Sequence, residues 1–140
     1  MQKEMVKCEA ASVQSVSGGK ILIIDDELED LEYYSKILKG LGREVVACPS
    51  YVQGIRLLEH ESFDLVVTSQ GGLGLKGLSV LNRAMEVDRG TPVLVLARCL
   101  NLDCYLESIQ MGAVDYLEKP VAPEEMARVV RNHLRTRDAA

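Results

Sequence analysis

The stretch KILIIDDE, residues 20–27, joins a short apolar run to three successive acids. The run at 21–24 is typical of a strand that is buried on both faces of a parallel sheet. Such a strand places the acids that follow it at the carboxyl edge of the sheet, where open α/β sheets bind ligands. Neighbouring carboxylates repel each other and attract a hard cation such as Mg²⁺. The same acids also suit the N-terminus of a following helix, so this stretch alone leaves both interpretations open.

The composition is that of one globular domain and excludes several classes of protein. The chain has 140 residues, of which 47% are hydrophobic and 26% are charged. Its net charge of -5 and its 4% of aromatic residues do not favour nucleic-acid binding. No apolar run approaches the length of a membrane span, and the four cysteines have neither CxxC nor zinc-site spacing. We therefore expect a cytoplasmic protein with reduced thiols and no membrane insertion.

Beyond residue 20 the chain alternates five times between a short apolar run and an amphipathic segment. This alternation predicts a five-stranded, doubly wound parallel sheet with helices on both faces, flavodoxin-like, in strand order 2-1-3-4-5. We expect this domain to cover 20–137, after a flexible leader at 1–19 and before a tail at 138–140. The predicted strands lie at about 20–25, 43–48, 63–69, 93–97 and 113–117.

Two of the predicted helices have recognisable first residues and apolar stripes. Ser50 and Gln53 form a capping-box pattern, and Asn101 is expected to cap the fourth helix, which Gly112 ends. In each helix the apolar residues at helical spacing are expected to face the core. These residues are Val52, Ile55 and Leu58 in the second helix, and Leu102, Tyr105, Leu106 and Ile109 in the fourth.

The ends of the predicted strands bring charged and polar residues to one edge of the sheet. The first strand ends at Asp25 and Asp26, the third at Ser69, the fourth at Ala97, and the fifth just before Lys119. A lysine beside carboxylates either pairs with them or holds an oxyanion that arrives together with a cation.

Five pieces of the sequence, in one register over about 20–135, resemble the receiver domain of two-component response regulators. They are ILIIDDE at 21–27, FDLVV at 63–67, GL at 77–78, PVLVL at 92–96 and GAVDYLEKP at 112–120. The resemblance implies phosphoryl transfer from a histidine kinase to an aspartate at the end of the third strand, assisted by Mg²⁺. It also implies signalling partners, either the kinase or a downstream output protein or domain.

The resemblance assigns roles to five residues at the strand ends. Asp26 is the direct Mg²⁺ ligand, Asp25 acts mainly through water, and the backbone carbonyl of Gly71 is a further ligand. Lys119 contacts the phosphoryl group, and Tyr116 matches the aromatic residue that turns inward on activation.

Two departures from the family pattern fall on residues that handle the phosphoryl group, and two more fall on the loop after the third strand. Ser69 stands at the phosphoacceptor position, and Ala97 stands where a hydroxyl residue is expected. Leu73 replaces the expected loop proline, and Lys76 replaces the usual acid. A serine needs a general base and weakens Mg²⁺ binding, because it removes one charge.

We therefore expect a degenerate receiver that is not an enzyme and that acts through protein contacts without aspartyl phosphorylation. Lys119 is then expected to pair with Asp25 or Asp26, so that replacing Lys119 with alanine changes stability or partner affinity. The fourth helix, fifth strand and fifth helix form the family's usual partner or homodimer face. In this chain that face is expected to include Tyr105, Ser108, Arg128 and Arg131.

Two alternatives stay open. One is a receiver that is still switched through a non-standard acceptor, either Ser69 or one of Asp25 and Asp26. The other is a nucleotide- or flavin-binding enzyme of flavodoxin-like fold, because GLGLKG at 72–77 matches GxGxxG. That loop follows the third strand rather than the first, which does not favour the enzyme.

Overall fold

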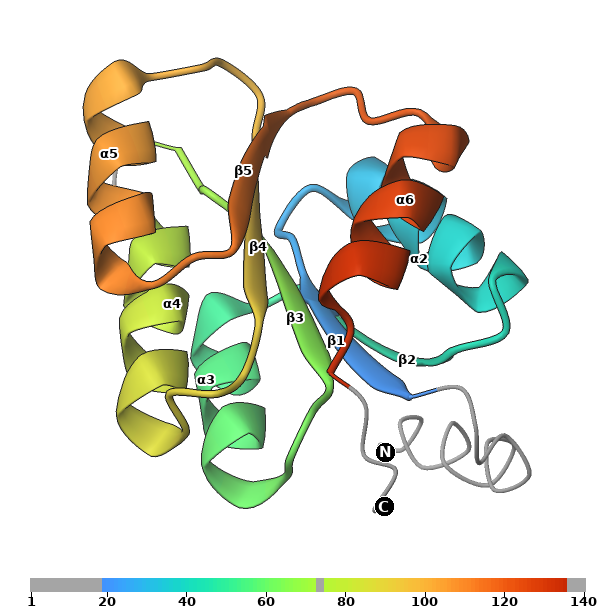
Figure 1. The fold of residues 1–140 in the computed structure, drawn as a ribbon, viewed down its shortest axis with the longest axis horizontal. Coiled ribbons are helices and arrows are strands. Elements are labelled where there is room, and N and C mark those ends of the chain that lie inside the picture. The colour runs from blue at the N-terminus through green and yellow to red at the C-terminus, as the bar shows by residue number, and fades with distance from the viewer. Residues whose placement is uncertain (1–18, 73–74, 136–140) are drawn as a thin grey trace.

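The predicted apolar runs form the strands of one parallel sheet. The computed structural model describes residues 19–72 and 75–135. Within them the strand order is β2-β1-β3-β4-β5 with every neighbouring pair parallel, which confirms the predicted topology (Figure 1). The strands are β1 (Lys20–Ile24), β2 (Glu44–Cys48), β3 (Leu65–Ser69), β4 (Val93–Ala97) and β5 (Asp115–Glu118).

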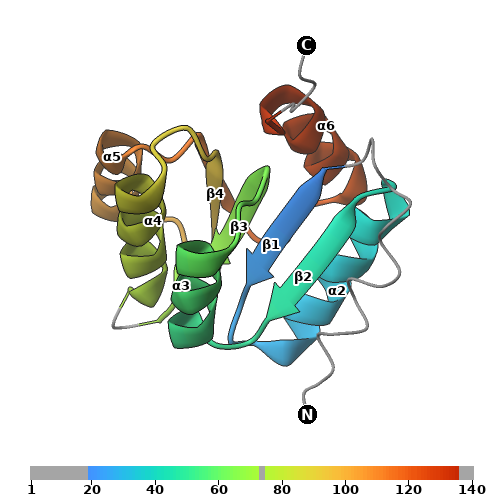
Figure 2. The same cartoon turned by 90° about the horizontal axis from the view of Figure 1, so that it is seen from below.

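The helices cover both faces of this sheet, as the alternating pattern predicted. One layer holds α2 and α6, and the other holds α3, α4 and α5 (Figures 1 and 2). None of the helices within the described residues has the length and hydropathy of a membrane span. The helices are α2 (Leu28–Gly40), α3 (Tyr51–His60), α4 (Lys76–Val87), α5 (Leu102–Met111) and α6 (Pro123–His133).

The inner strand β1 supplies both cores because its side chains alternate between the faces. Ile21 and Ile23 pack with the residues of α2 and α6, whereas Leu22 and Ile24 pack with those of α3, α4 and α5. All four are at most 1% exposed. The run at 21–24 is therefore apolar throughout because neither face of the strand meets water.

The predicted caps are confirmed. Ser50 Oγ accepts a hydrogen bond of 3.1 Å from Gln53 N at the start of α3. Asn101 Oδ1 accepts one of 2.9 Å from Cys104 N at the start of α5. Gly112 ends α5 with φ +117°, a backbone conformation that favours glycine.

The predicted inward face of α3 was wrong in one residue. Val52 is 63% exposed, and the buried residues of this helix are Tyr51, Gly54 and Leu58. A Cβ at Gly54 would overlap the side chain of Ile24, so the glycine lets α3 lie close against β1.

The predicted inward face of α5 was wrong as a whole. The four large apolar side chains of the stripe face outward, while Cys104 and Ser108 are the buried residues of the helix. Cys104 and Ser108 are four residues apart and so lie on one face of the helix, which leaves the large apolar side chains on its other faces. Ser108 is fully buried, so it does not belong to the expected partner surface. The exposed residues are Leu102, Tyr105, Leu106 and Ile109.

Some sequence predictions lie outside the described residues. These are the leader up to residue 18, the loop residues Leu73 and Gly74, and the tail, so the domain limits of 20–137 stay a prediction. Among the described cysteines, Cys48, Cys99 and Cys104 are free thiols.

Candidate functional site

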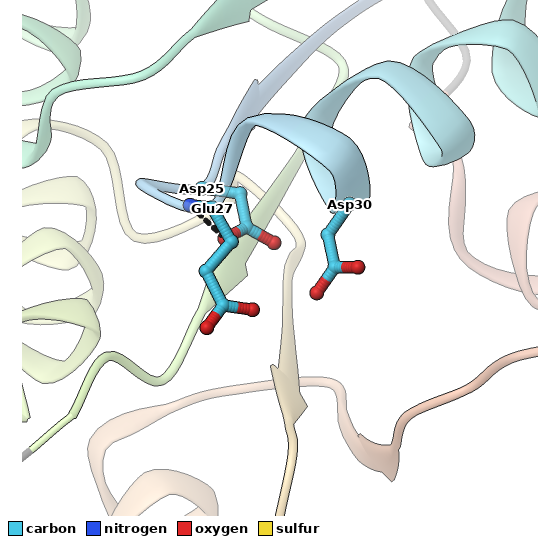
Figure 3. Close-up of side chains that lie close together, drawn as sticks. All are labelled: Asp25, Glu27 and Asp30. Atoms are coloured by element: carbon cyan, nitrogen blue, oxygen red, sulfur yellow. Dashed lines mark hydrogen bonds between the residues drawn. The ribbon is translucent and has the colours of Figure 1, made fainter.

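The carboxyl ends of β1, β3, β4 and β5 meet at one edge of the sheet. Because the strands are parallel and in register, Asp25, Ser69, Ala97 and Lys119 come from neighbouring strand ends. The loop to α2 also leaves from this edge, and it carries Glu27 into the same region (Figure 3).

Lys119 lies between two carboxylates at this edge. Its Nζ donates hydrogen bonds of 2.8 Å to Asp25 Oδ2 and of 2.8 Å to Asp30 Oδ2, and it lies 4.0 Å from Glu27 Oε1. The side chains of Lys119 and Asp25 are only 6% and 3% exposed. Of the two partners proposed from the sequence, Lys119 therefore pairs with Asp25.

Asp25, Glu27 and Asp30 form a cluster whose carboxylate oxygens lie within 4.8 Å of one another (Figure 3). The first turn of α2 sets this arrangement, because Glu27 is the N-cap and Asp30 lies one helical turn later. Glu27 N also donates a 3.0 Å hydrogen bond to Asp25 Oδ1. Sequence analysis did not single out Asp30, although an acid in the first turn of a helix is a recognisable pattern.

Arg98 adds a second cation to this cluster. It follows β4 directly, and one guanidinium nitrogen donates both to Glu27 Oε1 and, over 3.0 Å, to Asp30 Oδ2. Three carboxylates thus face two cations, one buried and one largely exposed. The sequence contained no signal for the Arg98 contacts, because they depend on how β4 and α2 are brought together.

Asp26 points to a different neighbour. Its carboxylate is not part of the three-acid cluster and accepts a 3.3 Å hydrogen bond from the Tyr51 hydroxyl. Burial raises the pKa of Tyr51 to about 12, while a hydrogen bond with Ser69 opposes that rise. The Tyr51 hydroxyl therefore lies between Asp26 and the serine that ends β3.

Ser69 is buried and has neutral partners. Its Oγ accepts a 3.4 Å hydrogen bond from Gly71 N, and its other partner here is the protonated Tyr51 hydroxyl. Gly71 has φ +90°, and a Cβ there would lie 2.9 Å from Lys76 N. Neither partner of Ser69 is a general base, which a serine nucleophile needs.

Burial raises the pKa of Asp25, and the hydrogen bond and positive charge of Lys119 oppose that rise. Desolvation disfavours a carboxylate, and an adjacent ammonium group favours it. The charged form of Asp25 thus depends on Lys119.

The donor groups fit the Mg²⁺ site that the resemblance implies only in part, because the Asp25 side chain is buried against Lys119 whereas Asp26 is exposed. Asp25 is paired with Lys119, Asp26 accepts from Tyr51, and Ser69 brings a hydroxyl in place of a charge. Mg²⁺ needs carboxylate oxygens that are free to face it. The one acidic cluster found in the described part of the chain is centred on an ammonium group.

Tyr116 links this edge of the sheet to α5. It is 5% exposed, and its hydroxyl donates to Gln70 Oε1, the side chain that follows Ser69. The rings of Tyr105 and Tyr116 meet edge to face, with centroids 5.7 Å apart. Ala97 is fully buried near the same strand ends.

A family model described as the response regulator receiver domain matches residues 21–131. The chain belongs to this family. Receiver domains are part of two-component signalling, and the flavodoxin-like fold expected from the sequence is the fold seen here.

Curated relatives are longer than this receiver domain. The two-component response regulator ARR14 of Arabidopsis thaliana is 29% identical over 87% of the chain, which covers 32% of that protein. The probable transcriptional regulatory protein SilR of Salmonella typhimurium is 31% identical over 83% of the chain. The chain spans about half of the length of SilR, 51%.

Solved structures match nearly whole receiver domains. A CheY-like response regulator receiver domain protein from Methanospirillum hungatei has a TM-score of 0.78 at 26% identity, over 83% of this chain and 93% of that one. The beryllofluoride-activated DrrB receiver domain has a TM-score of 0.71 at 30% identity, over 81% of this chain and 96% of that one.

Proposed function

We propose that this receiver domain is a protein-interaction module of two-component signalling that acts without phosphorylation of an aspartate. The observation that carries the proposal is Ser69 at the end of β3, with Gly71 N and the Tyr51 hydroxyl as its partners. A phosphoacceptor aspartate is ionised at neutral pH, whereas a serine must first lose its proton to a base.

Ala97 supports the same proposal. It ends β4 at the position where the family pattern expects a hydroxyl that grips the phosphoryl group. A methyl group cannot donate a hydrogen bond. The phosphoacceptor aspartate and the hydroxyl that grips the phosphoryl group are thus both replaced. This is expected of a domain that binds no phosphoryl group.

The outward stripe of α5 supports contact with a protein partner. Its large apolar side chains are between 38% and 69% exposed, next to Leu100 at 57%. A contiguous exposed apolar surface is typical of a protein interface. Arg128 and Arg131, which were expected at the partner face, are exposed on α6. We propose a histidine kinase, an output protein or domain, or a second copy of the chain as the partner at this face.

The acceptor proposal is tested by intact-mass measurement after incubation with a phosphodonor. The donors are acetyl phosphate with Mg²⁺ and a histidine kinase whose activity is first verified on a receiver that has the acceptor aspartate. We expect no gain in mass for this chain. A gain of one phosphoryl group that maps to Ser69, Asp25 or Asp26 would support the non-standard acceptor instead.

The enzyme alternative is tested by titrating FMN and NADH into the purified chain. We expect no saturable change in cofactor fluorescence. Saturable binding would favour the nucleotide-binding alternative and contradict the proposed module.

A further inference from the structure

The two residues that follow α6 are bound to the rest of the fold although they lie beyond the helix. The helix ends at His133, and the backbone is extended at Leu134. The Arg135 amide then donates a 3.0 Å hydrogen bond to the Asp64 carbonyl, at the entry of β3. Residues at the ends of a domain are usually poorly ordered unless other parts of the fold bind them. The end of α6 is therefore held by contacts outside the helix itself.

The Arg135 guanidinium binds two further acceptors. Its Nη1 donates a 3.0 Å hydrogen bond to Asp88 Oδ2, in the turn between α4 and β4, and its Nη2 donates one of 3.1 Å to the Phe63 carbonyl. Asp88 Oδ1 also accepts a 2.9 Å hydrogen bond from Gly90 N, and this bond and the one from Arg135 lower the pKa of Asp88. A guanidinium carries its donors in a fixed plane, so one side chain can bind two acceptors at once. Arg135 thus ties the end of α6 to β3 and to the turn before β4.

Leu134 lies against the residue that leads into β1. Its side chain packs against the core between the sheet and the α2 and α6 layer, and a Cβ at Gly19 would lie 3.1 Å from Leu134 Cδ2. The next residue, Lys20, donates a 2.8 Å hydrogen bond from its amide to Asp64 Oδ2. The chain therefore enters and leaves the described fold side by side, at the amino ends of the strands (Figure 1). This amino edge of the sheet is opposite to the candidate site.

We propose that Arg135, bound to Asp88 and to the Phe63 and Asp64 carbonyls, is a latch that fixes the end of α6 and sets the point from which the following chain leaves the domain. A segment that continues from either end of the described fold starts at the amino edge, so the candidate site and the outward stripe of α5 stay open to a partner. Opening the latch frees the last turn of α6 together with the following chain and leaves Ser69 undisturbed. The latch goes beyond the proposed function and does not depend on it.

The test measures amide hydrogen exchange in the purified chain by NMR, expressed as protection factors corrected for intrinsic rates. Arg135→Gln removes the guanidinium, and we expect protection at the amides of residues 134 and 135 to fall by at least about tenfold. Protection in β1 is expected to stay within about twofold of the wild type, because the opening is local. Arg128→Gln is the matched control on α6, since Arg128 is 53% exposed and lies 3.7 Å from Glu125. For this control we expect a change below about twofold.

A second variant isolates the ion pair from the other bonds of the latch. Asp88→Asn keeps an acceptor for Gly90 N and removes the charge that faces Arg135, so we expect protection at residues 134 and 135 to fall by about threefold. The two substitutions together are expected to have the effect of Arg135→Gln alone, because both break the same pair.

Two results for a folded Arg135→Gln variant would overturn the latch. One is unchanged protection at residues 134 and 135, and the other is an equal loss of protection there and in β1, which is a general loss of stability. If Arg135→Gln does not fold, Asp88→Asn decides the test, and no fall in protection at residues 134 and 135 would overturn the inference. None of these results depends on whether Ser69 accepts a phosphoryl group.

Discussion

Lys119 Nζ and Asp25 Oδ2 lie 2.8 Å apart in an ion pair whose side chains are 6% and 3% exposed. The two residues follow β5 and β1, which are separated by β3 and β4 in the sheet. The pair thus spans the carboxyl edge of the sheet. Removing one partner of a buried pair is costly, because the other charge stays buried without compensation.

Replacing Lys119 with methionine keeps the aliphatic stem and removes the charge. We expect Lys119→Met to lower the free energy of unfolding by about 3 kcal/mol, measured by urea denaturation. Lys36→Met is the control. Lys36 is 75% exposed, and its ion pair with Glu32 lies on the surface of the same helix. The control is expected to stay within about 0.5 kcal/mol of the wild type. A loss below about 1 kcal/mol for Lys119→Met would contradict the assigned role.

The same variant gives a prediction for pH. Burial already raises the pKa of Asp25 above its usual 3.8, and Lys119 limits the rise, so Lys119→Met is expected to raise that pKa further. A raised pKa means that the folded state holds the proton more tightly than the unfolded state. The free energy of unfolding of the variant therefore falls as the pH rises from about the unfolded-state pKa of Asp25, 3.8, through its raised folded-state pKa. The difference from wild type is expected to shrink in acid, where Asp25 is protonated, and a difference independent of pH would contradict this explanation.

Tyr51 is expected to stabilise the fold through its hydroxyl as well as its ring. Tyr51→Phe removes the hydrogen bonds to Asp26 and Ser69 and keeps the packing, so we expect a loss of about 1 kcal/mol in urea denaturation. Tyr33→Phe is the matched control, because the Tyr33 side chain is 46% exposed. Equal effects of the two substitutions would show that the Tyr51 hydroxyl contributes nothing beyond a surface tyrosine.

The strands could be predicted from the sequence because the local pattern of apolar residues and the length of each apolar run determine where a strand lies. The run at 21–24, the cap at Ser50 and the C-terminal glycine of α5 each depend on neighbours in the sequence. The same reasoning brought Asp25 and Lys119 to one edge, since the carboxyl ends of parallel strands meet there.

The rest of the site depends on contacts between elements far apart in the chain. Arg98 meets Asp30 across 68 positions, and Tyr51 meets Asp26 across 25. No local sequence pattern predicts a contact between residues so far apart in the chain. The orientation of α5 was missed because a helical stripe indicates an amphipathic helix without saying which side meets the core.

The orientation of α5 gives a prediction that separates the two faces of the helix. Leu102→Gln changes a residue that is 69% exposed, so we expect the free energy of unfolding to stay within about 0.5 kcal/mol of the wild type. Ser108→Leu adds volume to a fully buried position and is expected to lower it by about 1–3 kcal/mol. If Leu102→Gln lowered the free energy of unfolding more than Ser108→Leu, in thermal and urea unfolding, the apolar stripe would face the core as the sequence predicted.

Gly77 holds the start of α4 against the end of β3, next to Ser69. A Cβ at this position would overlap the Ser69 backbone carbonyl oxygen, and the Gly77 amide donates a 3.0 Å hydrogen bond to the Gln70 carbonyl. Because the obstructing atoms are backbone, Gly77→Ala must push α4 away from β3. We expect a loss of about 2 kcal/mol in urea denaturation, with amide shifts at Ser69 and Gln70. Gly72→Ala, in the loop before α4, is the matched control, since a Cβ there meets nothing within 4 Å. If both alanines are tolerated equally, α4 does not depend on Gly77 for its position, and Ser69 is held by its own hydrogen bonds alone.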